Sequence, residues 1–355
     1  MKGKKIVVGM SGGVDSSMSM LLLKKQGWEP IGVSLKLAKW EGEGNCLEQN
    51  VCCTEESFSI AKNICEKIGA QHHIYDVQKE FENEVINYFS FELKEGRTPN
   101  PCLMCNRNLK FAKLIEWADK HGIENVATGH YAKICKKKNG KFGLFKAVDN
   151  GKDQTYGLCM LKQEQLARIV LPLCDYTKEQ IYSMAKKEGF EFFLKRKQSQ
   201  DLCFVSSNAL HKFIEEKIGK KNGEIVDMQK KAIGKHNGLH FYTKGQKCGI
   251  AGGKIYYANK FDIEKNIIIA TDKKEDLMCK EIFLQNMNYL SGEEIKEQEV
   301  FAKIRHAPTI ERAKFEGLEN GRAKIVFEKA QYAPMSGQFC AIYDEEECLG
   351  AGQIV

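Results

Sequence analysis

The feature that most constrains the fold is the string IVVGMSGGVDSS at residues 6–17, close to the start of the chain. Ile6, Val7 and Val8 form a short apolar run of the kind found in buried strands. Two glycines then allow a tight turn, and the apolar pattern of residues 18–25 predicts a helix. A strand, a glycine turn and a helix N-terminus gather backbone N–H groups and the positive end of the helix dipole at one point. The string therefore predicts an anion site.

The glycine turn is not a Walker loop, because no Gly-Lys-Ser/Thr follows the glycines. It resembles SGGxDS, the signature of the ATP pyrophosphatases (PP-loop proteins), which cleave ATP to AMP and pyrophosphate. An ordinary glycine turn in an α/β domain is the alternative, and the complete string disfavours it. The resemblance implies that ATP is contacted by Gly9, Met10, Ser11, Gly12, Gly13, Val14, Asp15 and Ser16, together with Leu35 and Gly129.

Strand and helix patterns alternate through the first half of the chain. Strands are expected at 6–8, 30–35, 73–77 and 125–130, and helices at 18–25, 55–68, 81–93 and 106–120. This alternation predicts an α/β fold with a doubly wound parallel sheet, whose ligands lie at the carboxyl ends of the strands. The glycine turn and the tip Thr128-Gly129-His130 both fall on that edge, so two elements predict one site.

The pattern changes after about residue 201. A short helix is expected at 210–218, and turn-rich strand segments follow, including 323–327 and 339–343. Short strands separated by glycine turns predict a small β domain, most simply a barrel. The expected domains are a nucleotide domain at 1–205, a small central domain at 206–272 and a C-terminal β-barrel at 273–355.

Composition places the chain among globular proteins, with 43% hydrophobic and 28% charged residues. The first residues run directly into a strand and no apolar stretch approaches membrane-spanning length, so a cytoplasmic protein with no membrane partner is expected. In that compartment the 14 cysteines are candidates for catalysis, metal binding or redox chemistry rather than for a disulfide framework. The net charge of +7 is too small to predict nucleic-acid binding by itself.

The second informative stretch is GRTPNPCLMCN at residues 96–106. Pro99 and Pro101 stiffen the approach, and a helix is expected to begin at Cys105 or Asn106. A thiol at a helix N-terminus has a lowered pKa, which suits nucleophilic attack or metal ligation. Cys203, in the stretch SQDLCF at 199–204, reads by itself as a core cysteine.

These motifs together resemble the tRNA-specific 2-thiouridylases. The resemblance rests on seven collinear stretches: GMSGGVDSS, GRTPNPCLMCN, ATGHY (127–131), KDQTY (152–156), SQDLCF, GKHNGLHFYTKGQ (234–246) and CLGAGQI (348–354). It implies an adenine nucleotide α-hydrolase-like domain, a central domain and a C-terminal β-barrel. It also implies ATP- and Mg²⁺-dependent 2-thiolation of the wobble uridine, position 34, in the tRNA anticodon stem-loop. Cys105 and Cys203 would be catalytic, with Cys203 carrying a persulfide supplied by a donor protein and the two able to end as a disulfide.

The same resemblance implies a set of tRNA contacts. They are Asn100, Pro101, Cys102, His130, Lys152, Asp153, Gln154, Arg305, His306 and Gln338. His306 stands where the family usually has tyrosine, and Cys102 where many members have aspartate. Because Cys102 is a third cysteine, Cys102, Cys105 and Cys203 are an alternative set of ligands for a [4Fe-4S] cluster with one open iron site.

Two further readings remain open at this point. One is another adenylating enzyme on the same scaffold, such as an amide-forming ligase, which would need an amine channel rather than paired cysteines. The other is a metal-stabilised RNA-binding module with structural cysteines. The sulfur donor, the tRNA isoacceptors and the oligomeric state are not specified by the sequence.

Overall fold

The computed structural model describes residues 3–45, 47, 54–195, 202–306 and 309–355. Its N-terminal part is built on a five-stranded sheet in the order β3-β2-β1-β4-β7, with every neighbouring pair parallel. The strands are β1 (Lys5–Gly9), β2 (Glu29–Lys36), β3 (His72–Asp76), β4 (Asn125–Ala127) and β7 (Ile169–Val170). The central place of β1 puts the glycine turn in the middle of the carboxyl edge.

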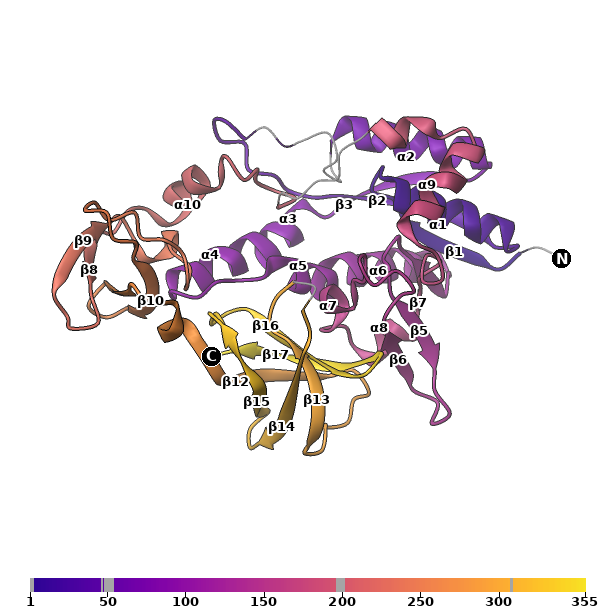
Figure 1. Cartoon of the computed structure of the whole chain (residues 1–355). Helices are drawn as coiled ribbons and strands as arrows, with labels where there is room; N and C mark the ends of the chain where they lie inside the picture. The colour runs from indigo at the N-terminus through magenta and orange to yellow at the C-terminus, as the bar shows by residue number, and fades with distance from the viewer. Residues whose placement is uncertain (1–2, 46, 48–53, 196–201, 307–308) are drawn as a thin grey trace.

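Helices cover both faces of this sheet, as Figure 1 shows. Ile6 and Val8 face a core that includes α1 (Val14–Lys25), α2 (Glu55–Ile68) and α9 (Lys178–Lys187). Val7, between them, faces the opposite core with α6 (Phe111–Lys120). The alternation along β1 follows from the two-residue period of a strand. The predicted doubly wound α/β fold is confirmed.

The helices before α6 differ from the expectation. The helix expected at 81–93 runs as α3 (Gln78–Phe81), a π-helical segment η1 (Glu82–Ile86) and α4 (Asn87–Lys94). The helix expected to begin at Cys105 or Asn106 begins at Pro101, as α5 (Pro101–Met104) followed by the π-helical η2 (Cys105–Lys110). Proline is well suited to the first helical position, because the N–H that it lacks would have no partner there.

Short elements fill the remainder of the nucleotide domain. They are the helices α7 (Thr155–Leu158) and α8 (Gln163–Leu166), the 3₁₀ turn η3 (Glu191–Lys195) and a hairpin of β5 (Lys133–Lys136) and β6 (Phe142–Phe145). The hairpin was not anticipated from the sequence. In the chain it belongs to the nucleotide domain, but β6 pairs with the last strand of the barrel.

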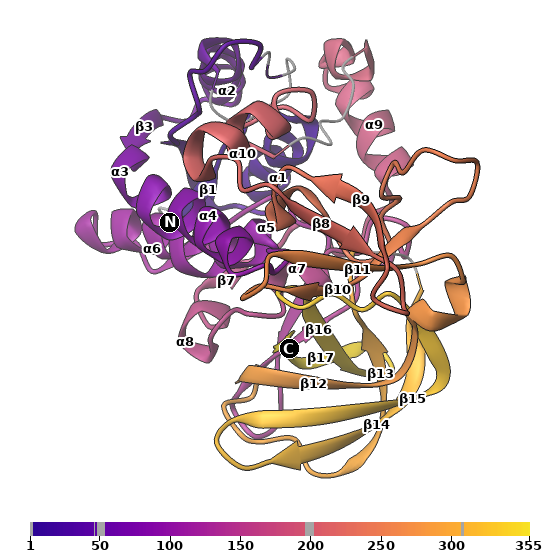
Figure 2. The ribbon, with the colours of Figure 1, turned by 90° about the vertical axis from the view of Figure 1, so that its left-hand side faces the viewer.

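The central domain carries a four-stranded sheet in the order β10-β11-β8-β9. Its elements are α10 (Leu210–Ile218), β8 (Gly223–Val226), β9 (Ala232–His236), η4 (Leu239–Phe241), β10 (Tyr257–Asp262) and β11 (Ile267–Thr271). It has its own small core, which includes Ile225, Ala258 and Ile268. Figure 2 shows this domain beside α4 and above the barrel.

After η5 (Lys274–Leu277), the chain ends in the expected barrel. Its strands are β12 (Met278–Tyr289), β13 (Gln298–Lys303), β14 (Glu311–Leu318), β15 (Arg322–Tyr332), β16 (Phe339–Asp344) and β17 (Glu347–Ile354). Pairing of β12 with β17 closes the order β12-β15-β14-β13-β16-β17. Phe339 and Tyr343 of the barrel share one apolar core with Val7 and Phe111 of the nucleotide domain, so the two domains are joined by packing as well as by the hairpin.

Candidate active site

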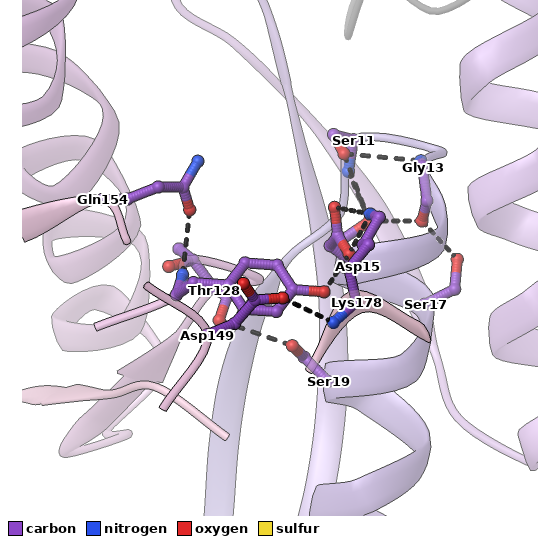
Figure 3. A network of polar contacts seen from close by, with 11 residues as sticks. Ser11, Gly13, Asp15, Ser17, Ser19, Thr128, Asp149, Gln154 and Lys178 are labelled. Carbon is purple, nitrogen blue, oxygen red and sulfur yellow. Dashed lines mark hydrogen bonds and ion pairs between the residues drawn. The ribbon is translucent and has the colours of Figure 1, made fainter. Parts of the chain in front are cut away.

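The glycine turn leaves the start of α1 open. Gly12 has φ +73°, and a Cβ atom there would lie 2.6 Å from the backbone oxygen of Ser57, so only glycine fits without strain. Gly13 is the N-cap of α1 and has no side chain to satisfy the first N–H groups. The Ser16 hydroxyl accepts from Ser11 N at 3.2 Å and donates to Gly13 O at 3.1 Å, which fixes the shape of the turn (Figure 3). The result is a backbone cradle at the positive end of a helix.

A pocket of about 220 Å³ lies beside this turn, at the carboxyl edge of the sheet. Seven of the expected ATP-contacting residues line it: Gly9, Met10, Ser11, Asp15, Ser16, Leu35 and Gly129. Gly12, Gly13 and Val14 do not line it and instead shape the turn behind it. The expected tRNA contacts His130 and Gln154 also line this pocket, as does Thr128 of the predicted tip, and so do four residues that sequence reasoning missed: Val33, Leu37, Lys110 and Leu114.

Asp15 is held by a partner that the motifs did not reveal. The Lys178 ammonium lies 2.6 and 2.7 Å from the two carboxylate oxygens of Asp15, and the Tyr131 hydroxyl donates to Oδ1 at 2.8 Å. Lys178 begins α9, far from the glycine turn in sequence, and its ammonium also lies 5.0 Å from the ring centre of Tyr182. The lysine side chain is 10% exposed and the aspartate side chain 34%. Figure 3 shows this pair between the helix start and the strand edge.

His130 enters the pocket as a neutral ring. Burial, together with the charge of Lys110, lowers the pKa of His130 to about 3. Its Nδ1 lies 2.8 Å from the Thr128 hydroxyl. Because the imidazole carries no charge near pH 7, it can orient a polar group in the pocket but cannot neutralise a phosphate.

The two expected catalytic cysteines belong to one cluster. Cys105 is 2% exposed, and Cys203 is half-buried and packs against the same apolar group. Phe204, next to Cys203, is fixed because its carbonyl oxygen accepts from Trp40 N at 3.0 Å and from the Asn45 amide at 3.2 Å. The structure therefore places these two cysteines, which are far apart in sequence, at the same apolar cluster. The preceding part of the motif, residues 199–201, lies outside the described residues.

The position of Cys105 differs from the expectation. The helix begins four residues earlier, so the exposed Cys102 occupies the first turn and Cys105 the second. The prediction that Cys105 lies at the helix N-terminus was wrong, because Pro101 starts the helix instead. Among the described residues, no three His, Cys, Asp or Glu side chains are arranged to hold a metal ion.

The nucleotide pocket and the cysteine cluster share the end of β2. Leu35 and Leu37 line the pocket, and both also pack in the cluster that holds Cys105. These two leucine side chains therefore connect the nucleotide pocket to the cysteine cluster.

The remaining expected tRNA contacts divide into two groups. Lys152 is exposed, whereas the Asp153 carboxylate accepts from the Thr155 hydroxyl at 2.6 Å. Gln154 accepts from Tyr131 N at 2.8 Å.

The second group gathers around Tyr156, at the junction with the barrel. Asn100 hydrogen-bonds the Tyr156 side chain, and the exposed His306 ring lies 6.2 Å from that of Tyr156. The Arg305 guanidinium donates to the carbonyl oxygen of Tyr332. Gln338 is 9% exposed and donates to the carbonyl oxygens of Thr98 and Pro99, on the approach to Cys102. Pro101, the first residue of α5, is buried.

A parallel sheet with this glycine turn and pocket at its carboxyl edge defines a nucleotide domain of the PP-loop class. Family models match three successive parts of the chain: a tRNA methyl transferase HUP domain at 4–207, a tRNA methyl transferase PRC-barrel domain at 211–272 and an aminomethyltransferase beta-barrel domain at 279–354. No helix among the described residues is long and apolar enough to cross a membrane.

Curated relatives align over the whole chain. A tRNA-specific 2-thiouridylase MnmA of Acetivibrio thermocellus is 39% identical over an alignment of 360 positions that covers 100% of both chains. A tRNA-specific 2-thiouridylase MnmA of Halothermothrix orenii is 39% identical over 99% of this chain and 98% of its own. A solved 4-thiouridine synthetase–RNA complex with bound ATP aligns with 61% of this chain and 50% of its own, at 17% identity and a TM-score of 0.38, too low to support any argument. The chain belongs to the tRNA-specific 2-thiouridylase family, which is a family of sulfurtransferases.

Proposed function

We propose that this protein uses ATP to replace the C2 oxygen of uridine 34 in tRNA by sulfur. The uridine oxygen attacks the α-phosphorus of ATP, pyrophosphate leaves, and the adenylated C2 becomes open to a sulfur nucleophile. The observation that carries the proposal is the pairing of a phosphate cradle with a two-cysteine cluster across the end of one strand. Membership of the thiouridylase family supports the same reaction.

The ATP half of the proposal rests on the glycine turn. The backbone N–H groups at the start of α1 suit the phosphates, and Lys178 supplies a buried positive charge beside them. Asp15 is the pocket carboxylate that suits Mg²⁺, with the Ser11 and Ser16 hydroxyls next to it. When bound, Mg²⁺ would neutralise phosphate charge. Gly129 keeps the pocket open, because a Cβ atom there would lie 2.6 Å from the backbone of Asp15.

The sulfur half uses Cys105 and Cys203. A persulfide on Cys203, supplied by a donor protein, attacks C2 through its outer sulfur, and AMP leaves. The Cys105 thiolate then attacks Sγ of Cys203, and the bond between this Sγ and the outer sulfur breaks. The outer sulfur stays on the uridine, and the cysteines form a disulfide that a thiol reductant must reduce before the next turnover. A reducing compartment, the cytoplasm, suits this cycle.

The tRNA half requires a flipped base, because a stacked wobble base cannot reach a pocket. We place the base edge against Asn100-Pro101-Cys102 and the anticodon stem-loop along Lys152, Arg305 and His306, which lie at least partly at the surface. In this proposal the domain at 1–205 activates the uridine. The central domain at 206–272 and the barrel at 273–355 extend the surface that binds tRNA. A [4Fe-4S] cluster held by Cys102, Cys105 and Cys203 stays the alternative to the persulfide.

The test is ATP-dependent sulfur incorporation into unmodified tRNA, with a persulfide donor, by the wild type, Cys105→Ser and Cys203→Ser. Both variants should remain folded, bind tRNA and release pyrophosphate, yet transfer no sulfur. Cys174→Ser is the matched control, because Cys174 is half-buried in the same domain but outside the cysteine cluster. Joint loss of stability and tRNA binding would favour the RNA-binding module. Pyrophosphate exchange that needs a small acid instead of tRNA would favour the ligase, and iron in anaerobically purified protein would favour the cluster.

A further inference from the structure

The segment that leads to Cys102 is held from the barrel side by two sets of hydrogen bonds. The Gln338 amide donates to Thr98 O at 2.9 Å and to Pro99 O at 3.1 Å. The backbone N–H of Thr98 donates to Ser336 O at 2.8 Å. Barrel residues therefore satisfy three backbone groups immediately before α5.

The second set begins at the last strand of the barrel. Gln353 of β17 donates to Glu92 Oε2 at 2.7 Å, across 261 residues of sequence. Glu92 in turn accepts from Arg97 Nε at 3.0 Å and from its terminal nitrogen at 2.7 Å. Glu92 is 5% exposed, so this paired contact is shielded from water. The Glu92 carboxylate thus links Gln353 to Arg97, the residue before Thr98.

The two sets are joined within the barrel. The backbone N–H of Ile354 donates to Gln338 O at 2.7 Å, and Gly337 N donates to Ile354 O at 3.0 Å. Gly337 has φ +90°, and a Cβ atom there would lie 2.9 Å from Arg97 Cβ and from Thr98 O. The turn at 336–338 and the end of β17 therefore form one surface that fits closely against residues 97–99.

We propose that four residues are positioning residues: Gln338, Gln353, Glu92 and Arg97. Their contacts set where the helix that carries Cys102 and Cys105 begins. The family resemblance suggested Gln338 as an RNA contact, but its amide is buried and both of its hydrogen bonds go to the protein. The barrel then acts on sulfur transfer through the protein backbone, by fixing the start of α5 against the cysteine cluster. This inference rests on the proposed function.

The main test is Gln338→Met, which keeps the length of the side chain and removes its donor. In a single-turnover reaction, 2-thiouridine formation should fall by about 10- to 100-fold, because sub-ångström misplacement of reacting groups slows a reaction by this order. The ratio of 2-thiouridine formed to pyrophosphate released should therefore fall. The Kd for tRNA should change by less than about 3-fold, because the proposed stem-loop contacts Lys152, Arg305 and His306 lie outside the segment that Gln338 holds. Glu92→Gln should shift the same ratio of thiouridine to pyrophosphate in the same direction.

Gln298→Ala is the control, because Gln298 is an exposed glutamine at the start of β13 in the same barrel. It should leave all three quantities unchanged. A weaker Kd for tRNA with normal sulfur transfer in Gln338→Met would overturn the inference and make Gln338 an RNA contact. An equal fall of every step, accompanied by lower thermal stability, would overturn it in favour of a general structural role.

A second measurement does not depend on activity. The rate at which iodoacetamide alkylates Cys102, followed by mass spectrometry of its peptide, should change at least about 3-fold in Gln338→Met and not in Gln298→Ala, because a thiol reacts according to its exposure and surroundings. An unchanged rate in both variants would overturn the inference. A wild type in which Cys102 is alkylated but no sulfur is transferred would refute the proposed function. The alkylation rates of the two variants would then still decide the positioning role.

Discussion

The contact between Asp15 and Lys178 should be the main polar tie between the glycine turn and α9. Lys178→Met tests it, because methionine keeps most of the apolar stem beside Tyr131 and Tyr182 and removes the ammonium. The change leaves the Asp15 carboxylate with the Tyr131 hydroxyl. Since the pair lies between two helices, its loss should loosen the packing of α1 against α9.

The expected magnitude follows from burial. A hydrogen bond to a charged group contributes about 1.5–3 kcal/mol net, and the lysine makes two such contacts with one carboxylate. The Asp15 side chain is 34% exposed, so water can replace part of what is lost. We therefore expect a coupling free energy of about 1–2 kcal/mol between the two residues, well below the 3–5 kcal/mol typical when a fully buried pair is broken.

The assay is a double-mutant cycle of Lys178→Met and Asp15→Asn in urea, followed by tryptophan fluorescence. All three tryptophans, Trp28, Trp40 and Trp117, lie in the nucleotide domain, so the signal reports that domain. With a slope of about 2–3 kcal/mol per molar urea, Lys178→Met should lower the midpoint by about 0.3–1 M. The double variant should be less destabilised than the sum of the single variants.

Additive single effects, within about 0.5 kcal/mol, would refute this reasoning, because independent residues add and coupled ones do not. The same cycle with Tyr131→Phe and Asp15→Asn provides a reference, since that pair shares one hydrogen bond at 2.8 Å and should couple by about 0.5–1.5 kcal/mol.

Two further predictions concern the pocket. His130 has its folded-state pKa lowered to about 3, so the unfolded chain binds a proton first and stability is lost as the pH falls from about 6.5 towards 3. His130→Gln should therefore lose less stability than the wild type between pH 7 and 4.5 in urea titrations, and parallel curves would contradict the assignment. Gly129→Ala would place a Cβ atom 2.6 Å from the Asp15 backbone, so it should cost about 1–3 kcal/mol and raise the KM for ATP. Gly157→Ala, where the nearest atom lies at 3.6 Å, should do neither, and an unchanged KM in Gly129→Ala would show that the pocket is not where ATP enters.

Local signals made parts of the fold predictable. The expected bounds of α2 agree with the structure, because Thr54 forms a capping box at its start and Gly69 adopts a left-handed conformation at its end. The start of α5 was misplaced because Pro101 reads both as a helix breaker and as a good first residue. Only tertiary contacts decide between these two roles.

The candidate site also contains some residues that the sequence predicted and others that it did not. The glycine turn was readable, since backbone conformation and a continuous string define it. Lys178 was not, because its role comes from burial beside two tyrosines and an aspartate from distant segments, and no spacing in the sequence encodes that. The hydrogen bonds of Gln338 were also invisible, since a motif can indicate that a glutamine matters without indicating what it contacts. Which residues contact ATP and tRNA stays a prediction.

The hairpin of β5 and β6 carries a consequence for synthesis of the chain. Its strand β6 has one pairing partner in β5 and the other in β17, at the end of the chain. Just beyond β6, Lys146 donates to the backbone of Glu345 across 199 residues. The nucleotide domain leaves the ribosome before the barrel does. Until β17 is synthesised, one edge of β6 therefore has no pairing partner from this sheet. Contacts so distant in sequence slow folding, and an unpaired edge invites association with other chains. We therefore expect the separated nucleotide domain to aggregate unless the hairpin is covered.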